Sequence, residues 1–391
     1  MRKVKSLLLV LLLLTAVSSN ALAQGTAKIP DPTSASQKMC KALSEITGVA
    51  ISPLLGMGVV GAREYFYAKT DAERDRLPWF ANPLFWIPAF LLVGLCFVKD
   101  AAGATVLPTI LKKPLDACET VEHKISGLIA TGAFVPIVAS IFHAPDNATG
   151  ASLAGAGFAA IDLHWLYNCL TVPIAMAAFF VVCLASNAIN ILILLSPFTT
   201  IDTSLKLFRA SILASVVVSS EANPWVGAAW ALVIIVISYF IAGWSFRLSH
   251  FGLAFLWDFF TIRKHRFHPD PVKNKMFLSR KILKVPARTY GKLWRNEQNE
   301  LVFDYHPFLI LAKRTLILPA GNYETGRGIF YSEILRVDVD SAKTVILLPP
   351  RYLGHEEAVA KIYHFSGTRD VGLRAAWSWF KSLFTGRVPA T

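Results

Sequence analysis

Long apolar runs separated by short polar segments dominate the first two thirds of the chain. These runs cover residues 43–62, 82–98, 125–143, 151–195 and 224–246. A helix needs about 20 apolar residues to cross a bilayer, so the run at 151–195 must contain more than one segment, and we expect a break near Pro173. The pattern predicts a mainly α protein with a polytopic helical membrane domain over residues 43–246, comprising about five spans.

The number of full crossings depends on where the two ends of this domain lie. Residues 263–295 contain eleven Lys and Arg against a single acid, Asp270, which places the C-terminal part in the cytoplasm. An N-terminus on the outside then requires an odd number of crossings, so either 43–62 or 151–170 is re-entrant or interfacial. The charges of the other loops are balanced and leave both alternatives open. The predicted localisation is the cell inner membrane, multi-pass.

The N-terminus has the three parts of a secretory signal peptide. A basic start with Arg2, Lys3 and Lys5 precedes an apolar core at 7–17 and a small-residue cleavage site at 21–23. We therefore predict a signal peptide over 1–23 and a periplasmic segment over 24–42. An uncleaved anchor helix is the alternative.

After residue 246 the pattern changes from apolar runs to alternation. Residues 247–285 form a basic juxtamembrane linker, and Leu335, Val337 and Val339 then alternate with charged residues. Further strands are expected at 301–305, 308–312, 344–348 and 359–365, with turns at 296–299, 321–322 and 349–350. We predict a small cytoplasmic all-β domain over 286–366, a barrel or a sandwich.

The last segment, 367–391, carries an apolar stripe at helical spacing. This stripe consists of Leu373, Trp377, Phe380 and Phe384. It predicts an amphipathic helix on the membrane surface, or equally one packed on the β domain. Predicted contacts with anionic lipid headgroups are made by Arg263, Lys264, Arg266, Trp377 and Phe380.

A faint internal repeat runs through the apolar part. Ser52-Pro53 and Asn82-Pro83 recur as Ser196-Pro197 and Asn223-Pro224, with apolar helices in matching places. Ser or Asn before Pro is a helix start, so each pair should end one helix and begin another. In a transporter such breaks surround the substrate, which here gives the candidate site residues Ser52, Gly56, Gly58, Ser196 and Asp202. In a scaffold the same breaks only shape the helix ends.

Some of these residues also carry a family resemblance. Leu77-Pro78-Trp79, Asn82-Pro83, Asp100, Pro108, Asp116 and Asn223-Pro224 resemble a bacterial multi-pass membrane family defined as a domain of unknown function. The resemblance covers residues 40–246, and it departs from the family at Val98-Lys99, where an acidic residue is expected. It implies a membrane protein and no particular activity.

Two sets of polar residues could carry chemistry. Asp116, Glu119 and His123 fall on one helix face and could hold a cation or relay a proton, although acids in the first turns of a helix also complement its dipole. Asp162 and His164 lie inside an apolar run, where polar groups either join helices or line a path for a substrate or proton. Asn190 shares a polar stripe with Cys183 and Asn187 and has the same two interpretations.

The composition fits a membrane protein and excludes several other classes. The chain has 391 residues, 54% of them hydrophobic, a net charge of +13 and five cysteines without metal-ligand spacing. No nucleophile set, paired-carboxylate site or nucleotide fingerprint is present, so we predict no enzyme, no cofactor, no metal and no nucleic acid partner. The predicted function is a membrane scaffold or assembly protein that binds a cytoplasmic protein partner through the β domain. The alternative is a small-solute or ion transporter with its site at the paired Ser-Pro breaks.

Overall fold

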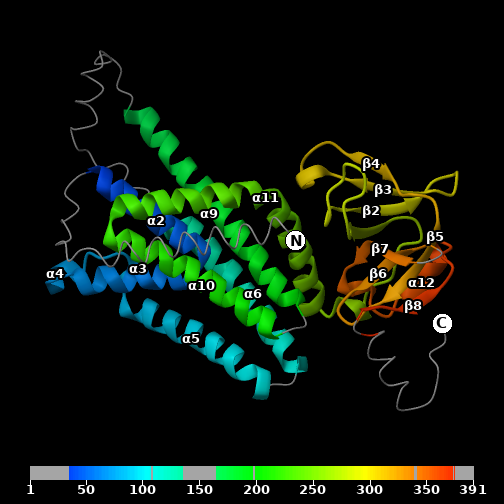
Figure 1. Cartoon of the computed structure of the whole chain (residues 1–391), viewed down its shortest axis with the longest axis horizontal. Helices are drawn as coiled ribbons and strands as arrows, with labels where there is room; N and C mark the ends of the chain where they lie inside the picture. Colours follow the sequence, from blue (N-terminus) through cyan, green and yellow to red (C-terminus); the bar gives the residue numbers. More distant parts are fainter. Residues whose placement is uncertain are drawn as a thin grey trace. The chain divides into compact units, whose positions relative to one another are not determined.

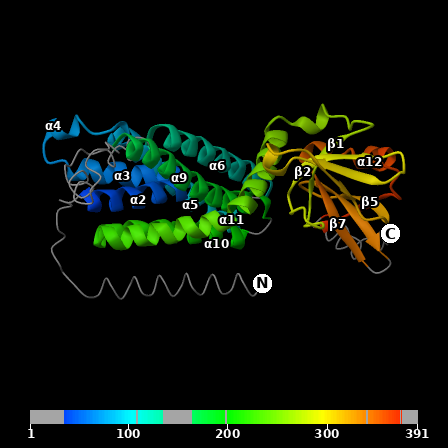
Figure 2. The same cartoon turned by 90° about the horizontal axis from the view of Figure 1, so that it is seen from above.

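A computed structural model describes residues 35–372 and 374, except 107–108, 135–163, 197–198 and 339–340. The chain divides into two compact units, residues 1–245 and 246–391, and each is described by itself (Figures 1 and 2). We call them the helical unit and the sheet unit.

The helical unit is built from helices that pack side by side around one apolar core (Figure 1). Its elements are α2 (Ala35–Ile51), α3 (Pro53–Tyr67), α4 (Asp71–Arg74), η1 (Trp79–Ala81), α5 (Pro83–Val106), α6 (Thr109–Ile129), η2 (Ala130–Phe134), α9 (His164–Leu195), α10 (Thr199–Ala222) and α11 (Pro224–Phe260), which continues into the sheet unit. The central helix is α2, which contacts α3, α9 and α10. Its residues Ile46, Val49 and Ala50 are fully buried, so α2 forms the middle of this core.

Both copies of the repeated sequence motifs lie at helix boundaries. Ser52 separates α2 from α3, and Ser196 follows the end of α9 shortly before α10 begins. The side-chain oxygens of Asn82 and Asn223 each accept a hydrogen bond from the backbone N–H two residues later, both at 2.9 Å, and so start α5 and α11 in the same way. The Asn-Pro helix starts therefore have an equivalent geometry in both halves.

The prediction of a polytopic helical membrane domain with about five spans is wrong. In the described part of the chain, only two helices are long and apolar enough to cross a membrane, Pro173–Leu195 within α9 and Pro224–Phe260, which is α11. The predicted segment at 43–62 is divided at Ser52 between helices of 17 and 15 residues, both shorter than a span. The apolar part of α5 is also short, Pro83–Cys96. The two long helices indicate association with a membrane.

The sheet unit consists of one mixed eight-stranded sheet with strand order β4-β3-β2-β1-β7-β6-β5-β8. Its strands are β1 (Asn274–Leu278), β2 (Tyr290–Arg295), β3 (Leu301–Tyr305), β4 (Arg314–Ile317), β5 (Asn322–Arg327), β6 (Ser332–Asp338), β7 (Ser341–Leu348) and β8 (Thr368–Asp370). Short helices join them: η4 (Arg263–His265), η5 (Pro307–Leu309), η6 (Pro350–Tyr352) and α12 (Glu356–Ile362). All neighbouring strands are antiparallel except β5 and β8, which are parallel.

An all-β barrel or sandwich is therefore also the wrong prediction for this unit. The expected strand at 359–365 is mostly α12, because Val359 and Tyr363 are buried at i and i+4, the helical period, and two acids occupy the first turn. The expected strand at 308–312 is a loop that includes η5. Strand β1 lies inside the predicted linker, and β8 lies inside the predicted C-terminal helical segment, most of which falls outside the described residues.

Candidate functional site

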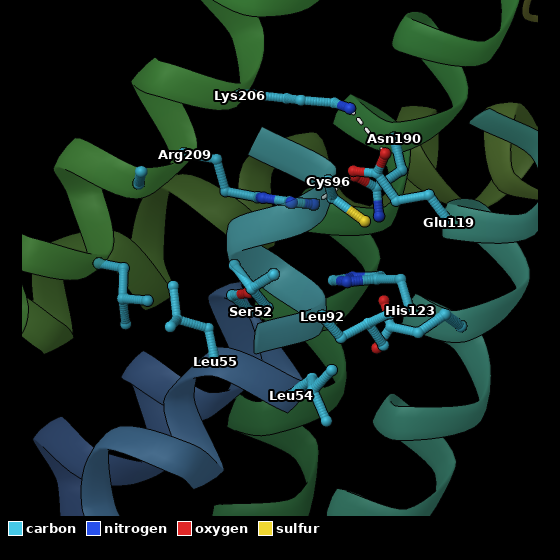
Figure 3. Close-up of a pocket in the computed structure, with 14 residues that line it drawn as sticks. Ser52, Leu54, Leu55, Leu92, Cys96, Glu119, His123, Asn190, Lys206 and Arg209 are labelled. Carbon is cyan, nitrogen blue, oxygen red and sulfur yellow. Dashed lines mark hydrogen bonds and ion pairs between the residues drawn. The ribbon is translucent and has the colours of Figure 1, made fainter. Parts of the chain in front are cut away.

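Five helices of the helical unit line a cavity of about 90 Å³ whose largely apolar wall includes several ionisable side chains (Figure 3). It is lined by Ser52, Leu54, Leu55, Leu92, Val93, Cys96, Glu119, Glu122, His123, Asn190, Lys206, Arg209, Ala210 and Leu213. These residues come from α3 and the residue before it, α5, α6, α9 and α10. The polar groups lie mainly on α6 and α10, so the cavity brings together segments almost 90 residues apart in the sequence, as the Lys206–Glu119 contact shows.

An ion pair joins α10 to α6 at the edge of the cavity. Lys206 Nζ lies 2.6 Å from Glu119 Oε2, and the two side chains are only 7% and 15% exposed. Such a pair is far less screened by solvent than one at the surface. It links α6 to α10 through long side chains, and it compensates one positive and one negative charge at the site.

Arg209 extends from the next turn of α10 and binds α9. Its guanidinium donates a short hydrogen bond to the side-chain oxygen of Asn190. Figure 3 shows Lys206 and Arg209 extending in parallel from α10 toward Glu119, Asn190 and Cys96. The amide nitrogen Nδ2 of Asn190 is buried and has no hydrogen-bond partner among the described residues, so it is one donor available at the cavity.

Two further titratable groups of α6 line the cavity, and burial favours the neutral form of each. Burial, reinforced by the charges of Arg209 and Lys124, holds the pKa of His123 well below its ordinary value. Burial raises the pKa of Glu122, although a hydrogen bond from Ser126 and the charge of Arg209 oppose that rise. Within the described part of the chain, His123 Nε2 and Glu122 Oε1 are buried without a hydrogen-bond partner.

The break between α2 and α3 supplies the remaining wall. Ser52 is 9% exposed and takes an extended backbone conformation before Pro53, the first residue of α3. Ser186 of α9 donates a short hydrogen bond to the carbonyl of Ile51 and so satisfies one acceptor at the end of α2. Gly56 follows one turn later and packs against α2, and Gly58 packs against Phe90 of α5.

A second buried charge cluster lies elsewhere in the helical unit. Arg63 of α3 binds Glu45 of α2 at short range, Glu221 of α10 at 3.1 Å and Glu64 at 2.9 Å. The cation and Glu45 are 15% and 10% exposed. These contacts tie three helices together, and because each charge has an opposite partner, we interpret the cluster as structural.

The cavity unites some of the sequence-predicted residues and leaves out others. Ser52, Glu119 and His123 line it, whereas Gly56, Gly58, Ser196 and Asp202 do not. Asp202 is fully buried in the first turn of α10, where the helix N-terminus favours an anion. The side chains of Asp116 and His164 and the whole of Asp162 lie outside the described residues. In the part of the chain that is described, no group of three possible ligands could hold a metal ion.

The predicted lipid contacts are found partly in the described structure. Lys264 and Arg266 are exposed, and Arg263 is half-buried beside Asp258 at 3.7 Å. Trp377 and Phe380 lie outside the described residues. Whether the three cations bind anionic headgroups stays a prediction.

The sequence reasoning missed Lys206, Arg209 and Glu122. A signal for the first two was present, because Asp202, Lys206 and Arg209 stand at i, i+4 and i+7 and must share one face of an apolar helix. A matching face on α6 has Glu119, Glu122 and His123 at i, i+3 and i+4. Two such faces of mixed charge in one apolar domain indicate that side chains from the two helices meet, as Lys206 and Glu119 do.

Comparison with protein-family models, with curated proteins and with solved structures finds no match to this chain. The cavity and its lining residues are therefore the basis for the function proposed below.

Proposed function

We propose that this chain is a membrane-associated binding protein whose helical unit holds a small monoanionic solute in the cavity between α3, α5, α6, α9 and α10. The observation that carries the proposal is that the cavity brings together two cations, Lys206 and Arg209, and the buried amide Nδ2 of Asn190, which has no hydrogen-bond partner among the described residues. An anion bound there would accept hydrogen bonds from Arg209 and from this amide.

The charge balance of the lining supports this ligand class. Lys206 and Glu119 cancel as an ion pair, while Glu122 and His123 favour their neutral forms because they are buried. Burial disfavours the charge of Arg209, and Glu119 and Glu122 oppose that effect; because burial also favours the neutral form of Glu122, a bound anion would add compensation for Arg209. Asp202 is not among the lining residues and has the N-terminus of α10 as its electrostatic complement.

The available hydrogen-bond donors support an oxyanion. Asn190 Nδ2 is buried and unpartnered among the described residues, and the guanidinium of Arg209 has five N–H groups in a planar fork. A carboxylate suits such a fork because two parallel N–H···O bonds can form. About 90 Å³ has room for roughly three water molecules or for a carboxylate with a few heavy atoms. Formate and acetate are therefore the appropriate probes.

The proposal can be tested on the full chain in detergent. Sodium acetate or formate at about ten times its Kd should stabilise the protein by about 1.4 kcal/mol relative to sodium chloride of equal ionic strength. That corresponds to a rise in Tm of about 3–6 °C. Arg209→Gln should abolish the rise, and Arg74→Gln, on the exposed helix α4, should retain it.

If the wild-type protein has the same Tm in acetate, formate and chloride, the cavity does not bind these anions, and its polar side chains form a structural network instead. If Arg209→Gln does not fold, equilibrium dialysis of labelled formate against the wild-type protein decides the question, since binding there needs no variant.

The functions predicted from the sequence are separate from this proposal. The scaffold function, with a cytoplasmic protein partner bound by the sheet unit, stays a prediction, as do the absence of enzymatic activity, the inner-membrane location and the cytoplasmic C-terminus. The transporter hypothesis placed Ser52 and Ser196 at one site. Only Ser52 lines the cavity, so the geometry favours solute binding over a site made of two equivalent breaks.

A further inference from the structure

Helix α11 contains a long stretch without charge that ends at a defined point. Residues 224–246 include no Asp, Glu, Lys, Arg or His, and Arg247 is the first charged residue of the helix. At 1.5 Å per residue the stretch is about 34 Å long, close to the thickness of the hydrocarbon core of a bilayer. Trp225 stands at one end and Trp244 near the other, and both are exposed. Aromatic residues at both ends are typical of a helix that crosses a membrane, and they place the second interface near Phe246 and Arg247.

The sheet unit carries an apolar loop between β3 and β4. Phe308, Leu309, Ile310 and Leu311 are consecutive and are 53%, 43%, 88% and 53% exposed. Four exposed large apolar side chains in a row are unfavourable in water. Phe308 and Leu309 also have positive φ angles of 51° and 67°, which bulky side chains rarely adopt. Strained backbone of this kind is often part of a binding site.

Hydrogen bonds within the loop satisfy much of its backbone. The N–H groups of Leu309 and Leu311 donate to the carbonyls of His306 and Pro307 at 3.0 and 3.1 Å. The imidazole Nδ1 of His306 lies 3.0 Å from the carbonyl oxygen of Leu311, and this contact joins the first and last residues of the loop. A loop with its backbone bonded internally and its apolar side chains outside can enter an apolar medium without leaving those polar groups unpaired.

Contacts within the sheet unit place the loop beside the end of the uncharged stretch. The ring of Phe308 lies 5.8 Å, centre to centre, from the ring of Phe246 in α11. Phe246, Arg247 and His250 line one small cleft together with residues 305–309. Lys313 and Arg314 follow the loop after Ala312 and are exposed; Lys313 pairs with Asp304 at 2.9 Å, and Arg314 is placed where a cation can contact lipid headgroups.

We propose that the β3–β4 loop, residues 306–311, inserts its apolar side chains into the lipid bilayer beside Phe246, where the uncharged stretch of α11 ends, and so forms a second membrane contact of the sheet unit. The occupant is lipid because the loop adjoins the point in α11 where the uncharged stretch ends and the first cation, Arg247, follows. This contact would hold the sheet unit at the bilayer surface through two elements. The proposal does not depend on anion binding by the helical unit.

The test uses the full chain, with its native cysteines replaced, in vesicles of three parts phosphatidylcholine to one part phosphatidylglycerol. A polarity-sensitive fluorophore is attached to an Ile310→Cys variant and, as the matched control, to an Ile329→Cys variant, because Ile329 is an apolar residue of the sheet unit that is 50% exposed on a different loop. The label at position 310 should show blue-shifted emission and should be quenched by lipids with a nitroxide on the acyl chain. The label at 329 should be quenched by a water-soluble quencher instead.

Two results would overturn the proposal. Quenching of both labels by the water-soluble reagent alone would place the loop in water. A blue-shifted label at 310 that neither reagent quenches, with disulfide cross-linking between copies of the Ile310→Cys variant, would show that protein covers the loop. Circular dichroism of each labelled variant verifies that the sheet unit is folded.

Discussion

Two corners of the helical unit, between α2 and α3 at Ser52 and between α10 and α11 at Asn223, depend on glycine, and replacing each glycine by alanine tests this. Gly56 and Gly227 are each the fourth residue after Ser or Asn in the sequence Ser/Asn-Pro-x-x-Gly. A Cβ atom at Gly56 would lie 2.6 Å from Cα of Val49, and one at Gly227 would lie 2.5 Å from Cα of Ser220. In both corners the obstructing atom is in the backbone seven residues earlier, so a change of rotamer cannot relieve the contact.

The expected loss of stability follows from these distances. Inserting a methyl group into a packed interior costs about 1–3 kcal/mol, and a backbone obstruction puts both variants toward about 3 kcal/mol. For a unit of this size such a loss lowers Tm by about 6–12 °C. Thermal unfolding of the full chain in detergent, followed by circular dichroism at 222 nm, measures the shift.

Gly94→Ala is the matched control. Gly94 lies in α5 and has no atom within 4 Å of the position of its Cβ. Alanine is better than glycine in a helix interior by about 0.5–1 kcal/mol, so this variant should be as stable as the wild type or slightly more stable. If Gly56→Ala and Gly227→Ala unfold at the same temperature as Gly94→Ala, close packing at the corners is not what holds these helices together.

Two further predictions concern charged pairs. Lys206→Met should lower the free energy of unfolding by about 3 kcal/mol because it removes the cation that lies 2.6 Å from the buried Glu119 carboxylate. The double variant Lys206→Met, Glu119→Leu should recover most of that loss in chemical unfolding. A double variant no more stable than the single one would contradict the pairing. In the sheet unit, burial raises the pKa of Asp304, but hydrogen bonds from Lys313 and Thr315 outweigh it and hold the pKa below its ordinary value. The folded state therefore prefers the carboxylate, and the resulting stability is present above the unfolded pKa of about 3.9 and lost as the pH falls through the lower folded pKa. When the pH falls from 5 to 3, the Asp304→Asn variant should lose less protection from hydrogen exchange in β3 than the wild type does. Hydrogen exchange of β3 peptides, corrected for intrinsic rates, measures this loss. Equal losses in the two proteins would show that Asp304 does not contribute to the pH dependence.

Local signals in the sequence predicted local structure well. The expected strand at 301–305 is β3, Leu301–Tyr305, and all five of its residues are buried. The turn expected at 296–299 joins β2 to β3, with Asn299 at a φ of 62° that Asn tolerates better than most residues. The helix boundaries at Ser52, Asn82 and Asn223 also follow from the sequence, because Pro can occupy the first turn of a helix but not its interior.

Features that depend on distant contacts could not be predicted in this way. The order of the eight strands, with β1 between β2 and β7, is set by packing in the core and has no signature in any single segment. The candidate site has the same limitation. Glu119 and His123 were recognisable as a helical face, but their partners Lys206 and Arg209 lie on another helix. A single charged residue in an apolar run indicates that burying its charge costs free energy. Only the fold shows which opposite charge offsets that cost.

The two helices that meet the criteria for a membrane span are apolar for different physical reasons. Of the most apolar window in α9, 44% is buried inside the structure, and this helix contacts α2, α6 and α10. Only 17% of the corresponding window in α11 is buried. Apolar surface that neighbouring helices cover is explained by the core of the unit, whereas apolar surface that remains uncovered needs an apolar medium. Hydropathy along the sequence cannot separate these cases because it counts residues and not neighbours. The membrane interpretation therefore depends mainly on α11, and the exposed loop at 306–311 lies beside Phe246, where the uncharged stretch of that helix ends.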